Sequence, residues 1–182
     1  LTKTKGASLE LSALNISSIG LSALWFDDER ERHMQEPVIN GLGDPVMSVA
    51  DIEAFLVSEF PQVHQDGRVF TVEDVRKGGI TYRLPPLERH LRPGGTVSGP
   101  SIFALADVAA DICILAHIGP AKHTVTTNMN INFMHKPEPG PLDCHARLLK
   151  LGRRLAVVDC LIMDRQGRTV SQATATYSIP NG

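Results

Sequence analysis

Apolar and polar positions repeat with different periods along the chain, and each period predicts a different element. After Ser48, four apolar residues recur at helical spacing until Pro61 ends the run: Ile52, Phe55, Leu56 and Phe60. Ser48 suits the N-cap position because its hydroxyl can accept a hydrogen bond from the first helical turn. The pattern therefore predicts a short amphipathic helix that begins after Ser48.

A second helix is predicted from residue 99 to residue 118, and it is apolar or small on nearly every side. Ser98 suits its N-cap, Pro100 is tolerated in its first turn, and a Gly-Pro pair at 119–120 ends it. Asp107 and Asp111 interrupt the apolar pattern and, four residues apart, lie on one face. A helix that is apolar all round belongs in the middle of a protein.

Strand patterns fill most of the remaining chain. Two precede the long helix and four follow it: 68–75, 79–84, 124–133, 142–150, 155–163 and 169–179. The last three are joined by short glycine-containing turns, which is typical of an antiparallel meander. The sequence thus predicts an α+β fold, in which one curved antiparallel sheet wraps around a long central helix.

The strand at 124–133 alternates strictly between two sets of residues. Val125, Thr127, Met129, Ile131 and Phe133 form one set, and Thr126, Asn128, Asn130 and Asn132 form the other. Successive side chains of a strand point to opposite faces of the sheet. The alternation therefore predicts that Thr126 and Asn128 share the polar face.

The first 46 residues differ in composition from the rest. Lys3 and Lys5 precede a loosely apolar, serine-rich stretch, which is partly the pattern of a signal peptide. Glu10 and Asn15 interrupt that stretch, and this favours a weak helix or a mobile arm instead. Prolines and glycines at 37–45 then form a linker. We expect a weakly structured N-terminal extension over 1–46 and one folded domain over 47–182.

Composition narrows the possible functions. The chain has 182 residues, 18 Lys plus Arg and 20 Asp plus Glu, so its net charge of −2 does not indicate a nucleic-acid binder. No uninterrupted apolar run of about 18 residues occurs, and no membrane span is expected. Three cysteines without short spacing predict neither a disulfide framework nor a metal site, and they favour a cytoplasmic location.

Two further kinds of chemistry are not indicated. The seven histidines show neither HxH nor HxxxH spacing, so we expect no metal and no other cofactor. No GxSxG occurs, which argues against a Ser-His-Asp hydrolase.

Three segments carry a resemblance to a known family: GGTVSGPSIFALADVA, TTNMNINFMHKPEPG and ATATYSIP. They resemble the hot-dog fold and, within it, the PaaI-like acyl-CoA thioesterases, over roughly residues 48–180. In that family the central helix begins with Gly-x-x-His-Gly-Gly and carries an acid eight residues after the first of the paired glycines. Gly99 and Asp107 have this spacing, whereas Ser98 replaces the histidine, Pro100 replaces the second glycine, and Arg92 stands where many members have asparagine.

The resemblance implies a catalytic set of Asp107, Gly99 and Thr126. Asp107 would act as general base or nucleophile; the alternative is a buried structural carboxylate. The amide of Gly99, at a helix N-terminus, would bind the thioester oxyanion, and the alternative is close packing at the helix start. The family also places a polar residue near Thr126 beside the acid, from the partner subunit. Asp111 would share the site or pair with an arginine across an interface.

Substrate contacts are expected from a second set of residues: Arg92, Ser98, Asn128, Arg153 and Arg154. Coenzyme A carries several phosphates, which suit arginine, although free surface arginines are the simpler explanation for 153 and 154. The predicted activity is hydrolysis of an acyl-CoA thioester of unspecified acyl group by a homodimer or homotetramer.

Two alternative functions remain. The first is a non-catalytic acyl-CoA-binding or sensing module, which the departures at Ser98 and Arg92 allow. The second is a hot-dog dehydratase, whose Asp-x-x-x-x-His pattern fails here because Ile112 follows Asp107 by five residues.

Overall fold

The structure is a computed structural model, and it describes residues 31, 39, 41–64, 70–120 and 124–180. Most of the predicted extension at 1–46 lies outside these residues. Ile39 and Leu42 of this extension pack against the core, and the N–H groups of Val46 and Met47, on either side of its predicted end, donate to the Ala116 carbonyl. The end of the predicted linker therefore contacts the domain, and the division at residue 46 stays a prediction.

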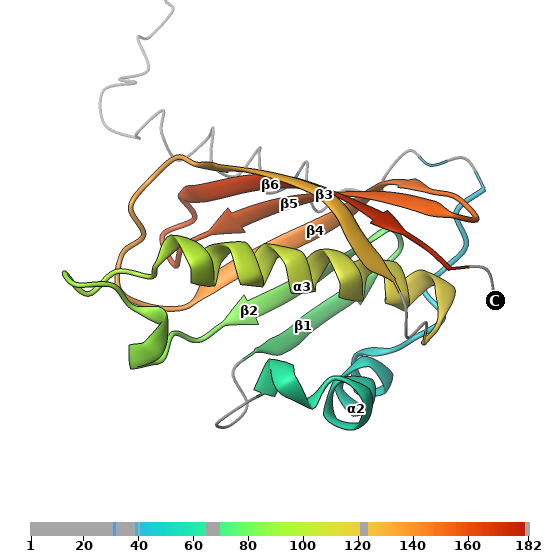
Figure 1. The fold of residues 1–182 in the computed structure, drawn as a ribbon, viewed down its shortest axis with the longest axis horizontal. Helices are drawn as coiled ribbons and strands as arrows, with labels where there is room; N and C mark the ends of the chain where they lie inside the picture. The colour runs from blue at the N-terminus through green and yellow to red at the C-terminus, as the bar shows by residue number, and fades with distance from the viewer. Residues whose placement is uncertain (1–30, 32–38, 40, 65–69, 121–123, 181–182) are drawn as a thin grey trace, which may run out of the picture.

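Six strands form one sheet behind a long helix (Figure 1). The strands are β1 (Thr71–Arg76), β2 (Gly79–Leu84), β3 (Val125–Phe133), β4 (Leu142–Leu151), β5 (Leu155–Met163) and β6 (Thr169–Ser178). Their order in the sheet is β1-β2-β4-β5-β6-β3, and every neighbouring pair is antiparallel. The α+β architecture and the β4-β5-β6 meander are confirmed.

The central helix α3 (Gly99–Ile118) forms the middle of the core. The hydroxyl of Ser98 accepts a hydrogen bond from the Ser101 N–H, and Gly119, with φ of 86°, ends the helix. Fully buried side chains such as Leu105 and Ala109 pack between α3 and strands β2, β4 and β5. The predicted helix and both of its ends are confirmed.

The length and mean hydropathy of α3 also meet the criterion for a membrane-spanning helix, which the interrupted sequence pattern did not predict. The helix has 20 residues and a mean hydropathy of 1.8, but 61% of the apolar window is buried inside the fold. Apolar character of this kind is what a core helix needs.

A shorter helix, α2 (Val49–Glu59), covers the β1 edge of the sheet and is followed by the 3₁₀ turn η1 (Pro61–His64). Ser48 and Asp51 form a reciprocal capping box at its start. Its buried side chains Ile52 and Leu56 belong to the core. A carboxylate oxygen of Glu53 accepts a hydrogen bond from the Val72 N–H at 2.9 Å, which ties the helix to β1. This helix is also confirmed.

Strand β3 lies at the opposite edge of the sheet, where it pairs with β6. Its register with β6 shifts between Thr126 and Asn128, so Thr127 forms a bulge. The predicted strict alternation is therefore wrong. Thr126 faces α3, whereas Asn128, opposite Thr176, faces away from the helix. The extra residue in the bulge reverses the orientation of every side chain that precedes it.

Candidate active site

Asp107 is held by two hydroxyl groups from adjacent strands. Thr126 Oγ1 donates to Asp107 Oδ1 at 2.8 Å, and Tyr177 Oη lies 2.6 Å from the same oxygen. Thr126 and Tyr177 are direct partners in the β3–β6 pairing, so the sheet presents both hydroxyls to α3 at one position. Among the described residues, no group donates a hydrogen bond to Asp107 Oδ2, and the Asp107 residue is partly exposed.

The resemblance placed a polar residue from the partner subunit beside the acid. In the structure, Thr126 reaches Asp107 within one chain. The bulge at Thr127 makes this contact possible, because it turns Thr126 toward the helix while the next residues keep their pairing with β6.

Tyr177 is a site residue that the sequence analysis did not single out. Its hydroxyl also lies 2.7 Å from the Asp107 carbonyl oxygen, so the side chain is anchored to both the main chain and the carboxylate of one residue. Burial raises the pKa of Tyr177, and its hydrogen bond to Asp107 raises it further. The phenol therefore stays protonated and acts as a donor. A tyrosine in a strand otherwise rich in small residues was the available signal.

Asp111 repeats the arrangement one helical turn further along α3. Thr124 Oγ1 donates to Asp111 Oδ1 at 2.5 Å. Burial raises the pKa of Asp111 to about 6, the Thr124 hydrogen bond lowers it, and the nearby charge of Asp107 raises it. The two carboxylates thus share a face, and Asp111 gains its proton well above the ordinary range of an aspartate.

Gly99 is the first residue of α3, where the N–H has no acceptor within the helix. The ring of Phe133, at the end of β3, lies 3.6 Å from the point where a Cβ would project from Gly99. Eight residues separate Gly99 from Asp107, which is about 12 Å along the helix axis. One chain therefore does not bring its own Gly99 N–H and Asp107 carboxylate to the same small group.

Ser98 and Arg92 lie at the same end of α3 as Gly99 and hold its entry loop. The Ser98 hydroxyl is 2.9 Å from the Ser101 hydroxyl, and the main-chain N–H of Ser98 donates to the His90 carbonyl. Arg92 Nε donates to Thr96 Oγ1 at 2.9 Å, and its main-chain N–H donates to the Thr96 carbonyl. These contacts fix the orientation of the first helical turn.

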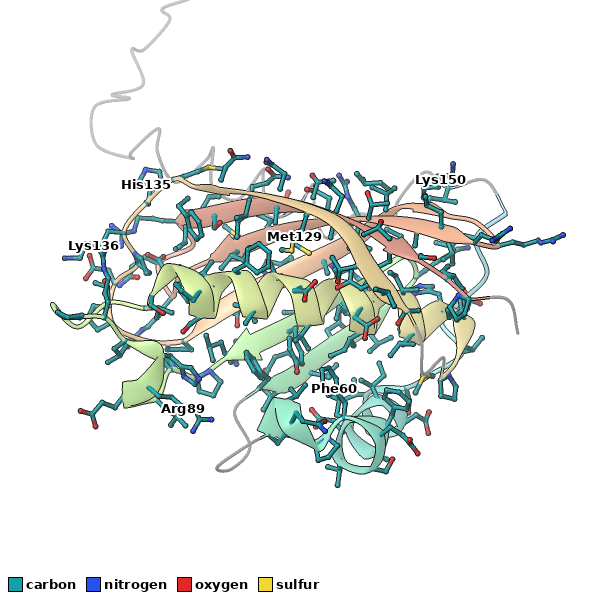
Figure 2. The ribbon with its side chains drawn as sticks, viewed as in Figure 1. Phe60, Arg89, Met129, His135, Lys136 and Lys150 are labelled. Carbon is teal, nitrogen blue, oxygen red and sulfur yellow. The ribbon has the colours of Figure 1, made fainter. Side chains whose placement is uncertain are left out.

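The remaining predicted residues lie elsewhere in the chain. Arg153 and Arg154 are exposed in the β4–β5 turn, which follows Lys150 at the end of the molecule opposite His135 and Lys136 (Figure 2). Asn128 is on the sheet face that points away from α3. Within one chain, these three residues do not meet Gly99 or Asp107.

The described residues hold no group of three or more His, Cys, Asp or Glu side chains placed to bind a metal ion. The three cysteines are free and buried in the core. Burial raises the pKa of the Cys113 thiol, which disfavours a reactive thiolate. The acid groups on α3 are thus the chemically usable groups of this region.

Comparison with known proteins identifies the class to which this fold and site belong. The model of the thioesterase superfamily matches residues 94–171. A solved structure of a provisionally named thioesterase from Silicibacter sp. TM1040 is 47% identical in sequence, with a TM-score of 0.72, and the match covers 80% of this chain and all of that one. The chain therefore belongs to the thioesterase superfamily and has the hot-dog fold.

More distant relatives agree. A thioesterase structure from Haemophilus influenzae has the same fold at 17% identity and a TM-score of 0.66, covering 77% of this chain and 95% of that one. A provisionally named esterase of Thermoplasma acidophilum is 27% identical over 110 residues, which are 60% of this chain and 83% of the relative. The Haemophilus structure supports the fold alone, whereas the names of the Silicibacter and Thermoplasma relatives support a thioester hydrolase activity.

Removing the Thr126 hydroxyl tests the positioning of Asp107. Thr126→Val should lower kcat/KM for thioester hydrolysis about tenfold, the scale of one hydrogen bond to a charged group. Thr127→Val is the matched control, because Thr127 Oγ1 donates to the Thr176 carbonyl and not to Asp107. Steady-state kinetics on both variants would contradict the assignment if the two changes had the same effect.

The raised pKa of Asp111 predicts a pH-dependent stability difference. Above pH 6 the carboxylate of Asp111 is charged in the folded protein, and the burial of that charge opposes folding. As the pH falls from 6 to 3.8, Asp111 binds a proton in the folded state before it does so in the unfolded chain. Asp111→Asn should therefore raise the free energy of unfolding at pH 8, by at most about 3 kcal/mol. The gain should shrink as the pH falls to 5. Urea denaturation at both pH values measures it, and a gain independent of pH would contradict the assignment.

Proposed function

We propose that this protein is an acyl-CoA thioesterase of the PaaI-like kind, which hydrolyses an acyl-CoA to the free acid and coenzyme A. The observation that carries the proposal is the held carboxylate. Thr126 and Tyr177 engage Asp107 Oδ1, and Oδ2 remains open on a partly exposed side of α3. A purely structural aspartate on this helix would have no need of an open oxygen.

The proposed mechanism uses two groups, the carboxylate of Asp107 and the N–H of Gly99. Asp107 Oδ2, or a water molecule that it deprotonates, attacks the thioester carbonyl carbon. The negative charge then moves onto the carbonyl oxygen, where the N–H of Gly99 and the positive end of the α3 dipole stabilise it. Collapse of the tetrahedral species breaks the C–S bond, and the coenzyme A thiolate leaves. In the general-base route the thiolate takes the proton that Asp107 accepted from water. In the nucleophilic route the thiolate takes a proton from solvent, and water then cleaves the anhydride, which releases the acid and restores the Asp107 carboxylate.

Both ends act on one substrate if the site lies between two subunits of a homodimer, with Gly99 from one chain and Asp107 from the other. Strand β3 supports this assembly, because it is a long edge strand with neither proline nor lysine to block pairing. Val125 and Phe133 on this strand are 58% and 54% exposed. Phe103, on α3, is 39% exposed. A homotetramer would be built from such dimers.

The remaining site residues have roles that depend on this assembly. Ser98 and Arg92 orient the entry loop, and Arg92 is a candidate contact for the substrate. Arg153 and Arg154 lie beyond the end of α3 opposite to Gly99, so in an antiparallel dimer they would approach the partner's entry loop and the coenzyme A phosphates. Asn128 lies on the sheet face that points away from α3, so it would contact only a part of the substrate that extends past the edge of the sheet. Three buried free thiols support a reducing, cytoplasmic location.

The alternative is a non-catalytic acyl-CoA-binding module. Such a module would keep a pocket for acyl-CoA but would not need an aspartate with an oxygen free of hydrogen-bond donors. The arrangement of Asp107 therefore favours the enzyme. Measuring free coenzyme A released from a panel of acyl-CoAs separates the two functions.

Asp107→Asn should reduce coenzyme A release by about a hundredfold or more, the scale of losing a positioned acid or base. Asparagine keeps the size of the side chain and the acceptor for Thr126, but it can neither take the proton nor attack as an anion. Asp74→Asn is the matched control, because Asp74 lies on β1 and pairs with Arg76.

Circular dichroism should show that both variants are folded. Unchanged hydrolysis in a folded Asp107→Asn variant would assign the chemistry to another group and make Asp107 structural.

A further inference from the structure

The outer face of the sheet, which points away from α3, is buried at its centre. Cys160 Sγ lies 3.5 Å from the Ala106 carbonyl of α3, so Cys160 faces the helix and Leu161, its neighbour in β5, faces away. The strand register pairs Leu161 with His145 of β4, and His145 with Thr81 of β2, so these three residues form one row across the outer face. They are only 4%, 2% and 8% exposed, respectively.

The sequence of β5 independently indicates that both faces of this strand are covered. Its outer positions include Val157, Leu161 and Met163, and the inner positions are apolar as well. Asp159 is the exception on the outer face, and it lies 3.7 Å from Arg147 of β4. Antiparallel sheets with one face in water normally alternate apolar and polar residues. The outer surface of β5 therefore has the composition of a buried face.

Among the described residues, no helix packs on this outer face. The helix α3 packs on the inner face, and α2 packs against the edge strand β1 (Figure 1). The loops join strand ends, whereas Leu161 and His145 lie inside their strands. The exposed fractions refer to a single chain, so a second copy does not account for them. The described part of the chain thus leaves the burial of this row unexplained.

The N-terminal part of the chain has the length and composition to cover this face. Its residues 9–26, LELSALNISSIGLSALWF, are rich in leucine, isoleucine and aromatic residues. The chain is anchored to the core at Ile39 and Leu42. The residues from 27 to 38 span up to about 40 Å when extended, which exceeds the length of about 30 Å expected for the nine residues of β5. The other segments outside the described residues have at most five residues.

We propose that the apolar segment 9–26 of this chain docks on the outer face of its own sheet, over the row formed by Leu161, His145 and Thr81. The segment removes the apolar outer surface of β5 from water. It also occupies the face through which two sheets could stack, so the proposed dimers do not assemble further by this face. The inference concerns the face opposite to Asp107 and does not depend on the proposed function.

The single tryptophan of the chain, Trp25, lies inside this segment and reports on its environment in the full-length protein. Its fluorescence emission should lie at shorter wavelength, and acrylamide should quench it less, than in the urea-unfolded chain. Leu161→Lys places a charge at the centre of the outer face, where burial of an unpaired charge is unfavourable. This change should release the segment and shift the emission and the quenching to the values of the unfolded chain.

The matched control is Leu149→Lys, which makes the same substitution at a 45% exposed position of β4. It should leave the emission of Trp25 unchanged, and circular dichroism should show that both variants are folded. The paired change Ile16→Lys and Ile19→Lys alters the segment instead of the sheet. It should also expose Trp25, and it keeps the proposal testable if Leu161→Lys fails to fold.

Three results would overturn the proposal. The first is a wild-type Trp25 emission equal to that of the unfolded chain. The second is an emission that a folded Leu161→Lys variant leaves unchanged; if light scattering then shows that this variant has lost subunits, the face belongs to a second copy. The third is a shift to longer wavelength when the wild-type protein is diluted to monomers, which would mean that the segment binds the sheet of another chain.

Discussion

The helix α3 forms the centre of the core, and its length fixes the distance between Gly99 and Asp107, the two groups of the proposed site. Its apolar sides must be buried against the sheet, so its position and rotation are set by packing. That packing determines which side remains partly exposed, and Asp107 and Asp111 lie on that side. Because a helix does not shorten, Gly99 and Asp107 of one chain stay about 12 Å apart, and the proposed mechanism therefore takes one group from each of two chains.

The sheet edge completes this arrangement. β3 and β6 together supply the hydroxyls that hold Asp107, and the bulge at Thr127 decides which β3 side chain does so. The same strand is the open edge at which a second copy would pair. Anchoring of the acid and assembly of the proposed dimer therefore depend on one strand.

The sequence predicted the elements well and their side-chain contacts less well. Helix ends at Ser48, Ser98 and Gly119 were predictable because capping and chain termination are local properties of those residues. The bulge in β3 was not predictable, because the β3 sequence alternates as that of a regular strand does. The bulge appears only in the pairing with β6. Tyr177 was missed for a related reason, because it lies 70 residues from Asp107 in sequence and only the β6 register brings them together.

The pairing of Gly99 and Asp107 from different chains can be tested by mixing two inactive proteins. Gly99→Pro removes the N–H at a helical position that tolerates proline, and Asp107→Asn removes the acid. Each protein alone should be inactive. After unfolding and refolding together at equal concentration, half of the random dimers pair one chain of each kind and hold one intact site, so the mixture should regain about a quarter of the wild-type rate. No recovery in a mixture shown to contain mixed dimers would mean that both groups act within one chain, and it would contradict the account.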